Sequence, residues 1–96
     1  MKGKKCIVRT YSAGVYFGTV NSIDGKTCIM NNARILRNWY GAIDTLEIAK
    51  EGVKYPEKCK FTSIVDEITL TEAIAIIPCS DKAISIIESV IEFKAN

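Results

Sequence analysis

The chain has 96 residues, of which 48% are hydrophobic and 25% are charged, and its formal net charge is +2. This length suits one domain, 1–96, with a single core, because a chain of this size buries roughly 60% of its unfolded surface. The absence of histidine excludes Ser-His-Asp and Cys-His catalytic sites and most catalytic zinc sites. No apolar run approaches the ~18 residues of a membrane-spanning helix, and the lysine-rich start lacks the apolar region of a signal peptide. We therefore expect a soluble, cytoplasmic protein that does not bind membranes.

Positive charge is concentrated in the first part of the chain. Residues 1–40 contain seven lysines and arginines and one aspartate, a balance of +6, so residues 41–96 sum to −4. A basic half suits an anionic partner such as a nucleotide or nucleic acid, while the first lysines also suit a solvated terminus. Arg9, Arg34 and Arg37 lie within apolar or aromatic stretches, where a guanidinium is typically placed for a partner.

Segments dense in β-branched and aromatic residues fill the first forty positions. They predict strands over residues 6–11, 15–23, 27–30 and 33–40. Asp24-Gly25 predicts a tight turn between the second and third of these strands. Asn31-Asn32 predicts a bulge or turn before the fourth. The first half of the chain is therefore expected to be a β-meander.

After Gly41 the pattern becomes helical. Asp44 lies three residues before Glu47, which is typical of a helix start, and Gly52 is typical of a helix end. The stripe of apolar residues between them is expected to comprise Ile43, Leu46, Ile48 and Ala49. Residues 52–60, with a proline and several charges, predict a mobile surface loop.

The last third of the sequence predicts further strands and a second helix. Alternating residues over 61–70 indicate a strand, and residues 73–77, which are apolar throughout, indicate the most buried strand. Ser80-Asp81 starts an amphipathic helix. Its apolar side is expected to hold Ala83, Ile84, Ile87, Val90 and Ile91. The predicted fold class is α+β, a small twisted or partly closed antiparallel sheet or barrel of five to six strands with one short helix and a C-terminal amphipathic helix.

The four cysteines are predicted to be reduced structural thiols. Cys6, Cys28, Cys59 and Cys79 include no Cys-x-x-Cys pair, and no histidine completes a zinc ligand set. Three of them fall in expected strands or at strand ends, where a thiol behaves as a small apolar group. We expect neither a metal nor another cofactor.

Two clusters are candidate ligand-binding residues. In the first, Arg9, Tyr11 and Ser12 precede a glycine-containing turn, and a guanidinium, hydroxyls and turn amides together can hold a phosphate. The alternative is a simple turn in which Tyr11 is an edge-strand aromatic and Arg9 forms a surface ion pair.

The second cluster lies between Asn32 and Tyr40. An asparagine can pair with an adenine edge, Arg34 can bind phosphate, and Trp39 or Tyr40 can stack on a base. The alternative is that the aromatics belong to a core or an oligomer interface while the arginines cover acidic helix residues. Both interpretations can be true at once if a pocket forms between subunits.

Catalysis finds little support in the remaining residues. Asp66-Glu67 and Glu72 alternate with apolar residues as a solvated sheet face does, and neither a phosphate-binding Gly-x-x-x-x-Gly-Lys loop nor a dinucleotide-binding Gly-x-Gly-x-x-Gly turn is present. We therefore expect a protein that is not an enzyme.

Two longer stretches carry a family resemblance. These are Val-Arg-Thr-Tyr-Ser-Ala-Gly-Val at residues 8–15 and Leu-Thr-Glu-Ala-Ile-Ala-Ile-Ile-Pro-Cys at residues 70–79. With Asp24-Gly25-Lys26, Asn32-Ala33-Arg34 and Trp39-Tyr40 between them, the sequence resembles a family of small uncharacterised bacteriophage and prophage proteins, a domain of unknown function.

This resemblance implies a phage-encoded protein that acts in the host cytoplasm, and it raises two functional hypotheses. In style the sequence is similar to viral sponge proteins, homo-oligomers that sequester nucleotide-derived immune signals in pockets between subunits. The first hypothesis is such a non-catalytic anti-defence protein with a phosphorylated nucleotide as ligand. The alternative is a small regulatory module that binds nucleic acid or a host protein, and a purely structural interaction protein is a third possibility.

Overall fold

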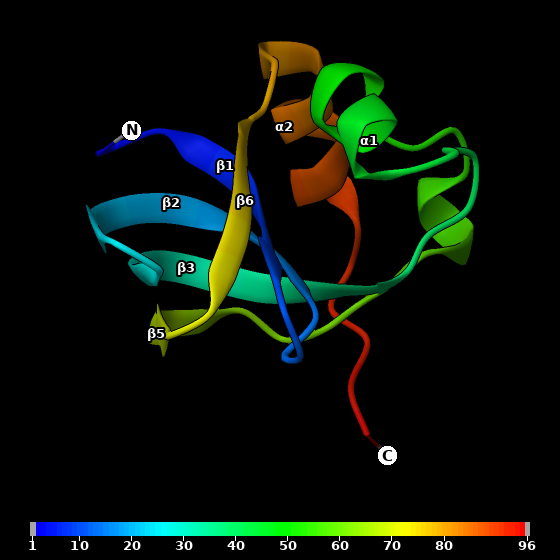
Figure 1. Ribbon diagram of the computed structural model, residues 1–96. Coiled ribbons are helices and arrows are strands. Elements are labelled where there is room, and N and C mark those ends of the chain that lie inside the picture. Colours follow the sequence, from blue (N-terminus) through cyan, green and yellow to red (C-terminus); the bar gives the residue numbers. More distant parts are fainter. Residues whose placement is uncertain (1, 96) are drawn as a thin grey trace.

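The computed structural model describes residues 2–95, which form six β-strands, two α-helices and one 3-10 helix (Figure 1). In chain order these are β1 (Lys5–Thr10), β2 (Val15–Asp24), β3 (Thr27–Asn38), α1 (Thr45–Glu51), the 3-10 helix η1 (Pro56–Lys58), β4 (Lys60–Phe61), β5 (Val65–Leu70), β6 (Ala73–Pro78) and α2 (Asp81–Ser89). No helix within this part of the chain is long and apolar enough to cross a membrane.

The strands form one antiparallel sheet that is not closed, in the order β4-β3-β2-β1-β6. The 12-residue strand β3 pairs with three other strands. On one side it pairs with β2, and on the other β5 pairs with its first half and β4 with its end. These observations confirm the predicted α+β class with an antiparallel sheet.

Local backbone conformation shapes the hairpin that β2 and β3 form. Gly25 has a φ of +61° in the turn that joins β2 to β3, and glycine adopts this conformation without a steric penalty. Asn32 has a φ of +51° and lies where the register between β2 and β3 shifts. The predicted bulge is therefore present, but it bends β3 instead of ending it. The predicted fourth strand is the second half of β3, which stops at Asn38 and leaves Trp39 and Tyr40 outside the sheet.

Two apolar clusters form on the sheet. One lies between the sheet and the two helices, which cover the same side of it, and it includes Ile7, Phe17, Leu36, Ile48 and Ile87 (Figure 1). The other lies among the strands themselves and includes Cys6, Val8, Val20, Cys28, Met30 and Leu70. Because side chains alternate along a strand, consecutive residues of β1 enter different clusters.

Both helices begin where expected and α1 also ends where expected, whereas α2 ends at Ser89, before Val90 and Ile91. The Asp44 carboxylate accepts a hydrogen bond from the Glu47 amide at 3.0 Å, and Glu47 accepts one from the Ile43 amide at 2.8 Å. Gly52, with a φ of +80°, closes α1 by donating to the Ile48 carbonyl. The Ser80 hydroxyl accepts from the Ala83 amide at 3.0 Å and donates to the Lys50 carbonyl at 2.6 Å. Ser80 thereby starts α2 and fastens it to the end of α1.

Three expectations about burial are wrong. Residues 73–77 do not form the most buried strand: Ile74 is 54% exposed because β6 lies at an edge of the sheet and pairs with β1 alone, whereas β1 contains three residues with no exposure. Ile91 lies beyond the end of α2 and is 85% exposed. In α1 the buried residues are Thr45, Ile48 and Ala49, while Ile43 and Leu46 face outward.

Candidate ligand-binding site

An open groove of about 320 Å³ lies where the β1–β2 hairpin meets the first turn of α1. Its lining residues come from three parts of the chain, and they are Arg9, Val15, Trp39, Ile43, Asp44, Thr45 and Leu46. Two of the predicted ligand-binding residues, Arg9 and Trp39, are thus brought together although 30 positions separate them. We refer to this feature as the Arg9 groove.

The strand register explains how Arg9 reaches this groove. Arg9 is paired with Val15 across the hairpin, and it is two residues beyond Ile7, which packs beneath the helices. Since side chains two residues apart share a face of the sheet, Arg9 lies on the helix-covered face. It is exposed there, and residues 2–95 provide no ion-pair partner for it. Its guanidinium is available to an anion.

The other walls of the groove are apolar. Trp39 is partly buried and packs against the cluster beneath the helices. Ile43, which precedes the N-cap of α1, and Leu46, in the first turn, are 85% and 64% exposed and form an aliphatic wall. Asp44 lines the groove too, but its carboxylate is bound to the Glu47 amide. A cation beside an indole and an aliphatic wall can hold a ligand that has both an anionic group and a flat ring.

The remaining residues of the first predicted cluster lie elsewhere. Tyr11 is 77% exposed and lines a separate hollow of about 210 Å³ with Lys26, Glu72 and Ile74. The Ser12 hydroxyl donates to the Glu72 carboxylate at 3.2 Å. Within the same turn, Thr10 donates to the Gly14 carbonyl at 2.7 Å and accepts from the Ala13 amide. The turn is therefore closed by its own side chains, and the structure does not bring Tyr11 or Ser12 into the Arg9 groove.

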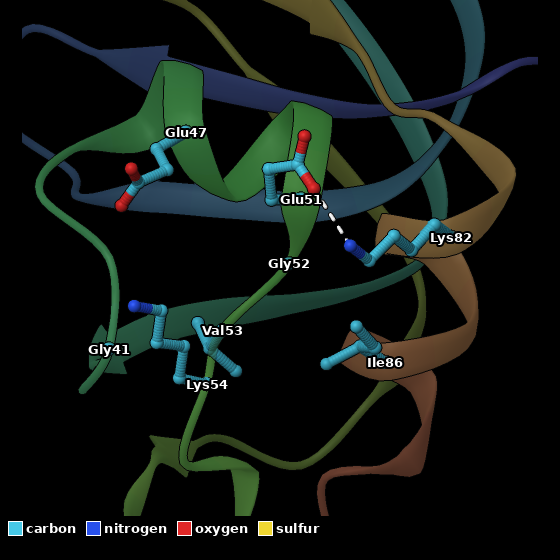
Figure 2. Close-up of a pocket in the computed structure, with 8 residues that line it drawn as sticks. All are labelled: Gly41, Glu47, Glu51, Gly52, Val53, Lys54, Lys82 and Ile86. Carbon is cyan, nitrogen blue, oxygen red and sulfur yellow. Dashed lines mark hydrogen bonds and ion pairs between the residues drawn. The ribbon is translucent and has the colours of Figure 1, made fainter.

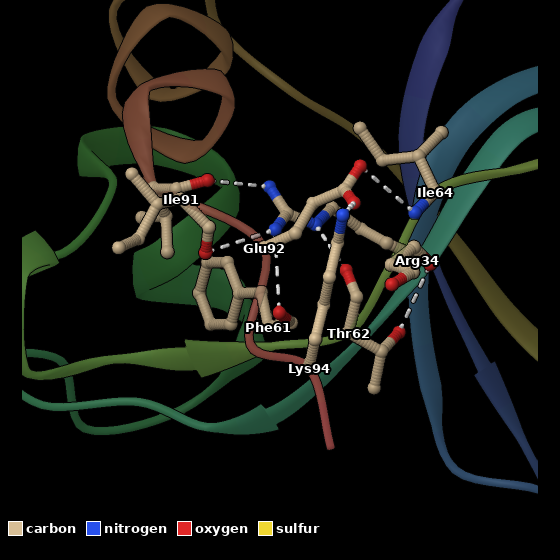
Figure 3. A network of polar contacts seen from close by, with 9 residues as sticks. Arg34, Phe61, Thr62, Ile64, Ile91, Glu92 and Lys94 are labelled. Carbon is tan, nitrogen blue, oxygen red and sulfur yellow. Dashed lines mark hydrogen bonds and ion pairs between the residues drawn. The ribbon is translucent and has the colours of Figure 1, made fainter. Parts of the chain in front are cut away.

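Arg34 is buried, with 3% of its surface exposed, and it binds main-chain groups (Figure 3). Nε donates to the Thr62 carbonyl at 3.1 Å, and Nη1 donates to the Val90 carbonyl at 2.9 Å. Nη2 donates to the carbonyls of Phe61 at 3.3 Å and Ile91 at 3.4 Å. The guanidinium carbon also lies 5.5 Å from the centre of the Phe61 ring. These donors join β3 to the C-terminal segment and leave Arg34 unavailable to a phosphate.

The charge of Arg34 is balanced at a distance by Glu92. Burial lowers the pKa of the Arg34 guanidinium, and the nearby Glu92 carboxylate opposes this effect. Glu92 accepts a hydrogen bond from the Ile64 amide and pairs with Lys94 at 3.5 Å, and these contacts, the amide first, lower the pKa of its carboxyl group (Figure 3). The cluster is therefore a structural network, in which Nε, Nη1 and Nη2 of Arg34 each have a hydrogen-bond acceptor.

Two other predicted residues, Asn32 and Tyr40, stand apart from the Arg9 groove. Asn32 is exposed at the bulge of β3. Tyr40 is 48% exposed and follows Trp39, but the groove includes only the tryptophan. The structure therefore divides the second predicted cluster among a groove, a buried network and two surface positions.

A second hollow, of about 370 Å³, lies between the ends of the two helices (Figure 2). Its rim carries Glu47, Glu51, Lys54 and Lys82, and the Lys82 ammonium donates to Glu51 at 2.8 Å. This hydrogen bond lowers the pKa of the Glu51 carboxyl group. Since Lys82 is bound to Glu51 and the rim carries a second carboxylate, Glu47, this hollow suits an anionic ligand less well than the Arg9 groove does. Within residues 2–95, no three side chains are grouped as metal ligands would be.

The outward position of Ile43 and Leu46 is the part of the groove that the sequence reasoning missed. The buried residues of α1, Thr45, Ile48 and Ala49, have the three- and four-residue spacing of one helix face. Leu46 lies three residues before Ala49 and therefore at the border of this face, and Thr45 takes the inward position in the first turn. Because Thr45 is polar, the sequence did not indicate that it belongs to the buried face of α1.

All four cysteines are free thiols. Burial raises the pKa of each, and for Cys79 burial, with Cys6 nearby, raises the pKa to about 12. Since the thiolate is the reactive form, we expect a disulfide reagent at about pH 8 to label the folded protein at least about tenfold more slowly than the unfolded protein. Mass spectrometry of timed samples, with protein in concentrated guanidinium chloride as the control, measures this ratio. Rapid labelling of Cys79 in the folded state would contradict it.

The fold and the groove define a small α+β domain with an exposed depression that contains a cation and an aromatic ring. Residues 3–87 match the model of a family described as Domain of unknown function (DUF6948), and the chain belongs to this family. Comparison with curated proteins and with solved structures gives no significant match.

Proposed function

We propose that the protein is a non-catalytic binding protein for a phosphorylated small ligand with a flat ring, such as a nucleotide, and that the ligand occupies the Arg9 groove. The observation that carries this proposal is an exposed arginine without an ion-pair partner in the described residues, placed beside a tryptophan in one groove. In this arrangement Arg9 binds the phosphate and Trp39 packs against the ring.

The chemistry of the lining supports binding without turnover. The acid in the groove, Asp44, is occupied as the N-cap of α1, and the chain has no histidine to act as a base. Proton transfer needs a group that is free to exchange its proton in contact with the ligand. A guanidinium donates hydrogen bonds and has no acceptor, so Arg9 serves as a binding group.

The biological form of this proposal is sequestration. A phage-encoded binder of this kind removes a nucleotide-derived immune signal from the host cytoplasm and returns it unchanged. Exposed Ile43 and Leu46 on the rim support a homo-oligomer, because a second subunit that covers them also encloses the ligand. Light scattering of the purified protein with and without ligand tests the oligomer.

A thermal-shift screen against cyclic dinucleotides, cyclic trinucleotides, ADP-ribose derivatives, NAD and ATP tests the binding. One ligand is expected to stabilise the protein, by about 2.7 kcal/mol at a hundredfold excess over its Kd. Chromatography of the ligand released by heating is expected to recover it intact. A chemically altered product would contradict the non-catalytic proposal.

Arg9→Ala is the decisive variant. We expect it to weaken binding about tenfold to a hundredfold, because hydrogen bonds to a charged group contribute about 1.5–3 kcal/mol. Its melting temperature is expected to stay close to that of the original protein, because Arg9 is exposed and unpaired in residues 2–95. The matched control is Arg37→Ala, which removes another exposed arginine outside the groove. Equal affinities of the two variants would exclude Arg9 as the phosphate-binding residue.

A further inference from the structure

A second surface, separate from the Arg9 groove, combines exposed aromatic rings with lysines. It lies where η1 and β4 meet the C-terminal segment, and it consists of Tyr40, Tyr55, Lys58, Lys60 and Phe93. The three rings are 48%, 47% and 51% exposed in that order. We call these five residues the aromatic–lysine strip.

Contacts join the members of the strip in two groups, which meet in the chain at Cys59. The Tyr55 amide donates to the Tyr40 carbonyl at 3.4 Å, so the two tyrosines start from adjacent main chains. The Lys58 ammonium lies 5.2 Å from the centre of the Tyr55 ring, and the Lys60 ammonium lies 5.2 Å from the centre of the Phe93 ring. Each lysine therefore stands over a partly exposed ring.

Cys59 lies between the two lysines in the chain. Its side chain is buried, with 8% exposure, and its thiol donates to the Tyr55 carbonyl at 3.4 Å. Cys59 has an extended backbone and a buried side chain, and its neighbours Lys58 and Lys60 are both exposed. One extended residue between them places the Cα atoms of Lys58 and Lys60 about 6.6 Å apart, so their flexible side chains can reach neighbouring phosphates of one nucleic acid strand.

The strip is also cationic. Residues 54–60 contain three lysines and one acid, Glu57. Among residues 2–95, neither Lys58 nor Lys60 has a carboxylate within ion-pair distance. Their charges are thus directed to solvent and to the rings, and an incoming phosphate meets no carboxylate bound to either ammonium.

We propose that the aromatic–lysine strip binds single-stranded nucleic acid. Lys58 and Lys60 contact successive phosphates, and bases stack on Tyr55, Phe93 and Tyr40. Stacking on an exposed ring requires a base whose face is free, which a single strand offers and a duplex does not. Every base has such a face, so the expected binding is insensitive to sequence.

Fluorescence anisotropy with a labelled oligothymidine tests this proposal. We expect binding at low ionic strength, weaker binding to a duplex of the same length, and a fall of log K with log salt of slope about −1.4 for two phosphate contacts. Phe93→Ala is expected to reduce the affinity about fivefold or more through lost stacking. Binding to the duplex as tight as to the single strand would overturn the proposal, because simple charge attraction would then explain it.

Charge reversal supplies the matched comparison. Lys58→Glu combined with Lys60→Glu is expected to reduce the affinity at least about tenfold, because both phosphate contacts are replaced by repulsion. The control Lys26→Glu reverses the charge of one lysine in the β2–β3 turn, at the opposite end of the molecule from η1 (Figure 1). It is expected to have little effect on the affinity for oligothymidine. Equal losses in the two proteins, or no binding by the original protein, would exclude the strip.

Arg9→Ala separates this inference from the proposed function. It is expected to keep the affinity for oligothymidine while its affinity for the small ligand of the groove falls about tenfold to a hundredfold. The Lys58→Glu, Lys60→Glu protein is expected to show the reverse pattern. A loss of both activities in Arg9→Ala would overturn the assignment of the two ligands to separate surfaces.

Discussion

Replacing Arg34 by methionine is expected to lower the free energy of unfolding by about 3 kcal/mol or more. The substitution keeps an apolar stem of similar length but removes the donors that bind the carbonyls of Thr62, Phe61, Val90 and Ile91. Hydrogen bonds to a charged group contribute about 1.5–3 kcal/mol, and a buried acceptor left without a partner costs about 1–3 kcal/mol. Denaturant unfolding followed by circular dichroism measures the change.

Arg34→Lys separates charge from geometry. A lysine retains the positive charge opposite Glu92, but its single ammonium cannot reproduce the planar fork that reaches β4 and the C-terminal segment together. We expect a loss of stability between those of the original protein and Arg34→Met. A methionine variant within about 1 kcal/mol of the original protein would show that water replaces the guanidinium at these carbonyls.

The second large effect is expected at Gly41, which connects the Arg9 groove to the hollow between the helix ends. Its φ is +88°, and a Cβ added there would lie 2.5 Å from Lys54 Cβ, 2.6 Å from Lys54 N and 2.9 Å from Lys54 Cα. Two of these atoms are backbone, and the Lys54 amide is bound to the Gly41 carbonyl, so neither segment can move away alone. We expect Gly41→Ala to cost about 2–4 kcal/mol.

Gly25→Ala is the matched control for that substitution. Gly25 also has a positive φ, +61°, but a Cβ there would meet no atom within 4 Å. Its expected cost is the conformational term alone, about 1–2 kcal/mol. Thermal and denaturant unfolding of the two variants therefore measures the steric contribution at Gly41 as a difference. Equal losses would show that the close approach to Lys54 contributes nothing.

The features predicted correctly from the sequence depend on neighbouring residues. The Asp24-Gly25 turn, the N-caps of both helices and the Gly52 C-cap of α1 each lie within a few positions, and the structure has them where the patterns indicate. The burial of residues 73–77 was predicted wrongly because it depends on where β6 lies in the sheet. An apolar run is the same in a central strand and an edge strand, and the pairing that distinguishes them joins distant segments.

In the candidate site, too, the features that depend on distant contacts could not be predicted from the sequence. The sequence marks Arg9, Arg34 and Trp39 as candidates because each lies in an apolar stretch. Nothing in the local sequence shows that the guanidinium of Arg9 is exposed while that of Arg34 is buried. The difference arises because Arg34 lies beneath the C-terminal segment, more than fifty positions away, whereas Arg9 lies beyond the edge of the helices. Tyr55 and Phe93 were not predicted as binding residues for a related reason, since only the fold places each beside a lysine.

The contacts of Arg34 also bear on which positions of this protein can vary. Its four acceptors are main-chain carbonyls, and a carbonyl is provided by every amino acid. The arginine therefore fixes the path of the C-terminal segment without requiring particular side chains at Thr62, Val90 or Ile91. Exposed positions such as 91 can therefore accept other side chains while the segment remains attached, and the requirement for a particular side chain falls on one residue in the middle of β3.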